Sequence, residues 1–125
     1  MPVRDTQRRL AAILAADAAG YSRLMETDEE GTILKFKVCR EIIGQAVSNH
    51  GGRVFGGAGD SLIVEFTSAV EAVRCAIDIQ QEIERHSIAE PPDRHLRFRI
   101  GVNLGDVIVD GESLVGDGID RKSVV

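Results

Sequence analysis

The chain has 125 residues, of which 43% are hydrophobic and 28% are charged, and its formal net charge is −5. This length and composition suit one folded domain and exclude an intrinsically disordered protein. The acidic balance argues against non-specific binding to nucleic acid, which needs a basic surface.

The two cysteines and the apolar runs bear on the compartment. Cys39 and Cys75 fall in helical patterns and lack the spacing of a metal site, so we expect buried free thiols in a reducing cytosol. The apolar run LAAILAA near the start is too short to cross a bilayer and lacks the features of a secretory signal. We therefore expect a cytoplasmic protein without a membrane segment.

The opening stretch RRLAAILAADAAGYSRLM is compatible with two structures. Its alanines favour a helix, whereas a short apolar run that ends in Asp-Ala-Ala-Gly also suits a buried strand that leads into a loop. The local pattern alone does not decide between them.

A helix is predicted in the next stretch, TDEEGTILKFKVCREIIGQAVSNHGG. Thr27 and Glu30 have the spacing of a capping box, and Gly51 and Gly52 end the helix. Its expected inner face repeats every four residues and consists of Leu34, Val38, Ile42 and Ala46, with Ile43 and Val47 beside them.

The stretch RVFGGAGDSLIVEF predicts a β-hairpin, because two β-prone runs flank a glycine-rich connection. Ser68 and Glu71 form a second capping box and begin a helix, which AEPPDR ends. The expected inner face of this helix is Val70, Val73, Ile77 and either Ile83 or Gln80.

The stretch HLRFRIGVNLGDVIVDG alternates apolar and polar residues as a half-buried strand does, and Gly105-Asp106 is expected to bend it. With a strand at the start, the order becomes β-α-β-β-α-β, which is the ferredoxin-like arrangement. We therefore predict an α+β sandwich, with an antiparallel sheet covered by helices on one face, and interpret the opening stretch as a strand.

Two aspartates are expected to meet in this sheet, because the first strand and the central hairpin are neighbours. Asp17 ends the first strand and Asp60 lies at the hairpin bend. Converging carboxylates can hold hard divalent cations, the flanking glycines allow a phosphate chain to approach the backbone, and the loop AGYS precedes a short helix whose N–H groups could bind phosphate. These features indicate a site for a nucleoside triphosphate with one or two metal ions.

Four stretches in order, LAADAAGYSRLM, HGGRVFGGAGDSLIVEF, AVEAVRCAIDIQ and RFRIGVNLGDVIVDGESLVGDGI, resemble the catalytic domain of class III adenylate/guanylate cyclases. The resemblance covers residues 9–119, with residues 1–8 as an N-terminal tail and residues 120–125 as a divergent C-terminal tail. It implies formation of a cyclic nucleotide and pyrophosphate in intracellular signal transduction. We expect ATP rather than GTP as the substrate, a preference that the resemblance itself does not carry over.

The resemblance also implies roles for single residues. Two Mg²⁺ or Mn²⁺ ions would be bound by Asp17, Asp60 and the carbonyl of Ala18. The substrate phosphates would contact the backbone of the segment formed by Ala19, Gly20, Tyr21 and Ser22, and Gly59 would also bind substrate. Active sites between two subunits imply a homodimer.

The chain departs from the family pattern at several positions. Gly56 stands where the family has a base-recognising lysine, and the second base contact falls at or near Ser113. Asp120 replaces an asparagine, and the arginine that stabilises transition-state charge would fall near Val124, out of register with Arg121. The family's last helix and hairpin are absent, so we expect a truncated domain in which no residue is assigned a catalytic role and which is weakly active or inactive alone.

The sequence is also compatible with other functions. One is a non-catalytic, cyclase-like module for nucleotide binding or dimerisation. Another is a diguanylate cyclase, against which the lack of an acidic pair directly after the glycines of GGAGDSLIVEF counts. The three histidines, His50, His86 and His95, are expected to lie on the surface because no metal-ligand spacing joins them.

Overall fold

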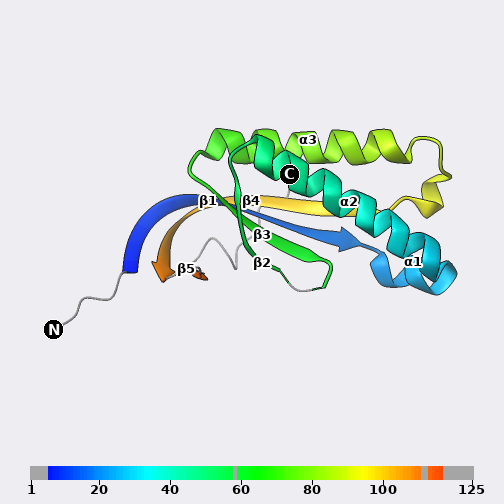
Figure 1. The fold of residues 1–125 in the computed structure, drawn as a ribbon, viewed down its shortest axis with the longest axis horizontal. Coiled ribbons are helices and arrows are strands. Elements are labelled where there is room, and N and C mark those ends of the chain that lie inside the picture. The colour runs from blue at the N-terminus through cyan, green and yellow to red at the C-terminus, as the bar shows by residue number, and fades with distance from the viewer. Residues whose placement is uncertain (1–5, 58, 111–112, 117–125) are drawn as a thin grey trace.

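The computed structural model describes residues 6–57, 59–110 and 113–116 (Figure 1). It confirms the predicted α+β class: an antiparallel five-stranded sheet with strand order β2-β3-β1-β4-β5, with α2 and α3 side by side on one face (Figure 1). The strands are β1 (Thr6–Ala19), β2 (Arg53–Gly56), β3 (Ser61–Phe66), β4 (Arg97–Asp110) and β5 (Ser113–Gly116), and the helices are α1 (Tyr21–Thr27), α2 (Glu29–Asn49) and α3 (Ala69–Ser87). A 3₁₀ turn, Pro92–Arg94, precedes β4.

The opening stretch is a strand, as the topology predicted. β1 pairs with β3 on one side and with β4 on the other, and it begins at Thr6, inside the stretch predicted as a tail. Its residues from Ala11 to Ala16 are all buried. The even-numbered ones join the main core under the helices, while Ala11 and Ile13 form a small cluster with Ile63 on the other face. A run of small and branched apolar residues thus fits a central strand that is covered on both faces.

The predicted bend at Gly105-Asp106 is wrong in one respect, because β4 continues as a single strand through both residues. β1 pairs with it along its whole length, from Thr6 opposite Asp110 to Ala19 opposite Arg97. The long ladder curves away from the helices (Figure 1). Continuous pairing therefore overrides the local turn signal of the Gly-Asp pair.

The predicted inner face of α2 is correct at its C-terminal end and wrong at its N-terminal end. Ile43, Ala46 and Val47 are buried, but Leu34 is 64% exposed and Val38 is 42% exposed. A row of residues four apart turns by about 40° per step around a helix, so three steps carry it by about 120°. The row therefore starts on the outer surface and reaches the core only near Ala46.

The predicted inner face of α3 is wrong except at Ile83. Val70, Val73 and Ile77 are exposed, and Gln80 is half-buried, where its Nε2 donates to the carbonyl of Phe98 at 2.9 Å. The residues that face the sheet are Ala72, Cys75, Ala76, Ile79 and Ile83. Three of these side chains are small, which lets the helix lie close to the strands. A prediction from side-chain hydrophobicity alone therefore assigned the wrong face of the helix to the core.

The helix caps follow the sequence in one case and depart from it in the other. Ser68 caps α3 by accepting from the Glu71 amide at 3.2 Å, as predicted. At α2 the cap is Asp28, which accepts from the Gly31 amide at 3.1 Å, whereas the Thr27 hydroxyl donates to the Arg23 carbonyl at the end of α1. The predicted cap at Thr27 is therefore wrong, because α1 already uses this residue.

The two cysteines are free and buried, which confirms the expected thiols. Burial is the main cause that raises the pKa of each thiol to about 11, so both are protonated at neutral pH. In the part of the chain that the structure describes, no helix has the length and apolarity needed to span a membrane.

The hairpin between β2 and β3 depends on one glycine. Gly57 has φ +146°, and a Cβ added there would lie 2.1 Å from the carbonyl oxygen of Ser61. A Cβ added at Gly56 would meet no atom within 4 Å. The backbone of Gly57 therefore passes so close to β3 that only glycine fits.

His50 joins the two long helices and is not a simple surface histidine. Its Nδ1 lies 2.8 Å from a carboxylate oxygen of Glu71, and its Nε2 lies 2.5 Å from one of Asp78. Arg74 also contacts Glu71, at 3.0 Å. The hydrogen bonds to Glu71 and then to Asp78 are the main causes that raise the pKa of His50 above its ordinary value.

This pair of contacts makes stability depend on pH. We expect the wild type to exceed His50→Gln in melting temperature at low pH. Because the folded-state pKa of His50 is raised, this advantage is fully present below the unfolded pKa of about 6.5 and is lost as the pH rises through the folded-state value. Thermal melts across this range test it, with His86→Gln on the exposed side of α3 as the control. A constant difference across the range would contradict the assignment.

The glycine at the hairpin gives a second test. We expect Gly57→Ala to lower the free energy of unfolding by about 1–3 kcal/mol or more, because it adds both a clash and an unfavourable backbone conformation. Gly56→Ala is the matched control and should change stability little. Urea unfolding of both variants measures this, and equal losses would show that the close approach to Ser61 is not limiting.

Candidate functional site at the β1 and β3 edge

Asp17 lies at the end of the central strand and is held by an arginine. Its register partners are Ser61 on β3 and Arg99 on β4. Arg99 donates from Nε to Oδ1 at 3.1 Å and from Nη2 to Oδ2 at 3.2 Å. This fork-shaped pairing of guanidinium and carboxylate fixes the orientation of both groups. The Arg99 side chain is 66% exposed and that of Asp17 is 24% exposed, so the pair lies at the surface with its acidic member partly covered.

Asp60 lies at the same edge, one residue before β3 begins. Its carbonyl accepts a hydrogen bond from the Ala18 amide at 3.2 Å, which extends the pairing of β1 and β3 by one step beyond Asp17 and Ser61. The structure therefore brings the backbones of the two predicted metal-binding aspartates to adjacent positions. Gly59, with φ +62°, precedes Asp60 in the turn.

The two aspartates have different surroundings. Asp17 lies between Ala16 and Ala18, which belong to the core under the helices, so alternation along the strand places it on the other face. Asp60 is among the residues that line a cavity of about 170 Å³ between α2 and the hairpin, together with Phe36, Arg40 and Phe98. Within the described residues, no group of three or more His, Cys, Asp or Glu residues could hold a metal ion.

The segment after Asp17 turns sharply into α1. Gly20 has φ +71° and stands before the first residue of the helix, and no side chain among the described residues caps it. The ring of Tyr21 packs against Phe36, with 5.2 Å between ring centroids, and Phe36 stacks on Phe98 at 6.1 Å. The aromatic contacts anchor the side chain of Tyr21 in the core, while the predicted phosphate contacts of this segment involve only its backbone.

Sequence reasoning did not select two arginines that the structure places at this edge. Arg99 holds Asp17, and the guanidinium of Arg40 lies over the ring of Phe36 at 5.8 Å from its centroid. Only the alternation in RFRIGV pointed to Arg99, as one of the polar residues of its strand. The missing information was the register between β1 and β4.

The structure describes only some of the positions at which the chain departs from the family pattern. Gly56 is the last residue of β2, and Ser113 is the first residue of β5. Asp120, Arg121 and Val124, which carry the predictions about a divergent end, lie outside the described residues.

Comparison with known proteins finds relatives that are named as nucleotide cyclases. A scan against models of protein families finds no match. The chain is 49% identical over 121 residues to a Rhizobium meliloti protein named "Putative adenylate cyclase 3", an alignment that spans 96% of this chain and 21% of that protein. The chain thus covers about a fifth of the length of this curated relative.

Solved structures extend the comparison. An adenylate/guanylate cyclase/hydrolase from Silicibacter pomeroyi superposes with a TM-score of 0.84 at 39% identity, over 92% of this chain and 67% of that chain. The adenylyl cyclase CyaB from P. aeruginosa shares the fold, with a TM-score of 0.74 at 21% identity over 97% and 66% of the two chains. With the strand order and the ordered motifs described above, these similarities show that the chain belongs to the class III adenylate/guanylate cyclase family.

Proposed function

We propose that this chain is the nucleotide-binding part of an adenylate cyclase, which converts ATP into a cyclic nucleotide and pyrophosphate with two divalent cations. The observation that carries the proposal is the hydrogen bond from Ala18 to Asp60, which sets the two aspartates of the family motif at one edge of the sheet. The similarity to a protein named as an adenylate cyclase supports ATP over GTP.

The donor atoms at this edge suit Mg²⁺ or Mn²⁺. Asp17, Asp60 and the carbonyl of Ala18 offer oxygen ligands, which these hard cations prefer. To share one ion, the Asp17 side chain on the face away from the helices and the Asp60 side chain at the cavity under α2 would have to turn toward each other. Two carboxylates are sufficient, because Mg²⁺ in nucleotide sites is usually held by one or two carboxylates together with substrate phosphates. Bound cations would supply charge stabilisation and a more acidic attacking hydroxyl.

The residues around the aspartates would bind and orient the triphosphate. The backbone of Ala19, Gly20, Tyr21 and Ser22 would contact phosphate oxygens. Gly20 and Gly59 adopt the positive φ of their turns and, as glycines, put no side chain in the way of a phosphate chain. Arg99 would exchange part of its contact with Asp17 for a phosphate oxygen, since a guanidinium binds either group through the same paired donors.

The proposed reaction forms one bond and breaks one bond. The 3′ oxygen of the ribose attacks the α-phosphorus, and the bond from that phosphorus to the bridging oxygen breaks. Pyrophosphate leaves, and the hydroxyl proton is released. The attack is intramolecular, and the role of this chain is to hold the triphosphate so that the bond to the leaving pyrophosphate lies in line with the attacking oxygen.

A homodimer completes the proposal. Two leucines of the long ladder support it, because Leu10 on β1 is 64% exposed and Leu104 on β4 is 55% exposed. The pairing of β1 with β3 ends at Ala12. Leu10 lies beyond this residue on β1, and Leu104 lies opposite it on β4, so both are at the end where the sheet narrows. Exposed apolar side chains in such a position are typical of a surface that a second subunit covers.

The aspartates give the direct test of function. We expect Asp17→Asn and Asp60→Asn each to lower cyclic AMP formation from ATP and Mn²⁺ by about a hundredfold or more, as loss of a charge-stabilising group commonly does. Glu84→Gln on the exposed side of α3 is the control and should keep full activity. If the wild type makes no cyclic nucleotide but binds Mn²⁺-ATP, the chain is instead a non-catalytic nucleotide-binding module.

The arginine gives a test of substrate binding. We expect Arg99→Ala to raise KM for ATP by about tenfold, because a lost charge-assisted hydrogen bond costs on the order of 1.4 kcal/mol or more. Arg97→Ala, two residues earlier on the same strand, is the matched control. Steady-state kinetics of both variants measure the effect, and equal KM values would remove Arg99 from the phosphate site.

A further inference from the structure

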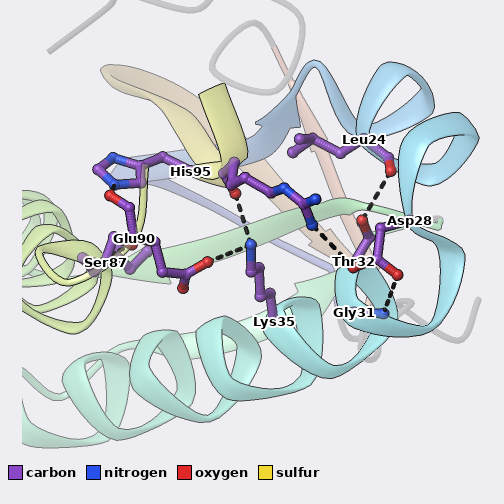
Figure 2. A network of polar contacts seen from close by, with 10 residues as sticks. Leu24, Asp28, Gly31, Thr32, Lys35, Ser87, Glu90 and His95 are labelled. Carbon is purple, nitrogen blue, oxygen red and sulfur yellow. Dashed lines mark hydrogen bonds and ion pairs between the residues drawn. The ribbon is translucent and has the colours of Figure 1, made fainter. Parts of the chain in front are cut away.

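A single aspartate makes the corner between α1 and α2. The Asp28 amide donates to the carbonyl of Leu24 at 2.9 Å and so closes α1. Its Oδ1 accepts from the Gly31 amide at 3.1 Å and so begins α2 (Figure 2). Its second carboxylate oxygen, Oδ2, accepts from Nη1 of Arg94 at 3.2 Å. One side chain therefore ties two helices to the connection that leads into β4.

Lys35, on the next turn of α2, reinforces this contact. Its Nζ donates to the carbonyl of Arg94 at 2.8 Å and forms an ion pair with Glu90 (Figure 2). A ring nitrogen of His95 in turn lies 2.8 Å from the carbonyl of Glu90. The connection between α3 and β4 is thus held against the start of α2 by its side chains and by its backbone.

The short helix α1 depends on this corner for its position. It has seven residues, which is too short for a helix to be stable by itself, and Leu24 is its one fully buried residue. The buried Thr32 hydroxyl donates to the Leu24 carbonyl at 3.0 Å. α1 is therefore fixed at its N-terminal end by the strand that precedes it, and at its C-terminal end by groups of α2 and the corner.

The same two segments are joined twice by aspartate–arginine pairs. Asp17 and Asp28 lie on either side of α1, and their partners lie five residues apart, Arg99 near the start of β4 and Arg94 in the 3₁₀ turn that precedes this strand. The Ala19–Ser22 segment runs between these two pairs. We propose that Asp28 and Arg94 are positioning residues that hold α1, and with it the Ala19–Ser22 segment, in place against β4. This inference rests on the proposed function of that segment in binding a triphosphate.

The variants can separate the ion pair from the helix cap. Asp28→Asn keeps a good N-cap and removes the charge, because asparagine caps helices as well as aspartate does. Arg94→Met removes the other partner, and Arg94→Lys retains the charge. Arg85→Met breaks an exposed ion pair with Glu82 and is the matched control, since this pair joins two residues of one helix, α3, and ties no other segment to the corner.

Two measurements test the inference. In the nucleotide-free chain, Arg94→Met and Asp28→Asn should both raise amide hydrogen exchange over residues 20–27 by about threefold, as expected for loss of an exposed ion pair, and the double variant should add little. With ATP, the same variants should raise KM about threefold and leave kcat within about twofold, and Arg94→Lys should restore KM.

The outcomes distinguish this inference from the proposed function. Unchanged exchange over residues 20–27 in Arg94→Met, or an equal change in Arg85→Met, would overturn the positioning role whatever the activity. Faster exchange with KM unchanged would also overturn it, because α1 would then move without affecting the substrate. A wild type that neither cyclises nor binds ATP, with exchange changed as expected, would overturn the proposed function instead.

Discussion

The pairing of β1 with two neighbours at once is the constraint on which the rest of the structure depends. β1 is bonded to β3 over six residue pairs and to β4 over fourteen. Its inner residues, such as Leu14 at 0% exposed, lie under both helices, and Ile13 is covered on the opposite face. Because β3 and β4 both pair with β1, the end of this strand is held on both sides by neighbouring strands. Asp17 stands there.

Electrostatic contacts then position the segments that strand pairing does not hold, such as α1. Arg99 and Arg94 each hold an aspartate of the β1–α1–α2 segment, and His50 joins α2 to α3 through two carboxylates. Each contact joins elements that lie far apart along the chain. The exposed aspartate–arginine pairs contribute little to overall stability. Their larger effect is to restrict how short elements such as α1 sit on a core that hydrophobic burial has already formed.

The sequence predicted most of the fold, because its strong signals are local. The hairpin glycines, the Ser68 cap and the Pro-Pro stop each act within a few residues, and the element order then required an opening strand. The inner faces of α2 and α3 were less accessible, because both helices carry apolar residues on two sides and only the packing against the sheet selects one. Val73 and Cys75 show this, since the smaller side chain is the buried one.

The residues of the candidate site also differ in whether local sequence signals identify them. Asp17 and Asp60 were found from glycines, strand ends and the order of the motifs, all of which can be read along the chain. Arg99 was not, because its contact with Asp17 joins residues 82 apart in sequence and exists only once the register of β1 and β4 is set. The cap at Asp28 was missed for a related reason, since α1 and α2 meet without a loop and compete for the same residues.

The two buried thiols have a practical consequence. Cys39 lies on the buried face of α2 and Cys75 on the buried face of α3, and burial keeps each thiol protonated. Cys75 is 0% exposed, so a thiol reagent in solution can reach it only when α3 lifts from the sheet, whereas Cys39 also lines a cavity beside Glu90 and Leu96. The chain thus carries two native reporters, and the rates at which they are modified would compare the opening of α3 from the sheet with the opening of the α3–β4 connection beside Cys39.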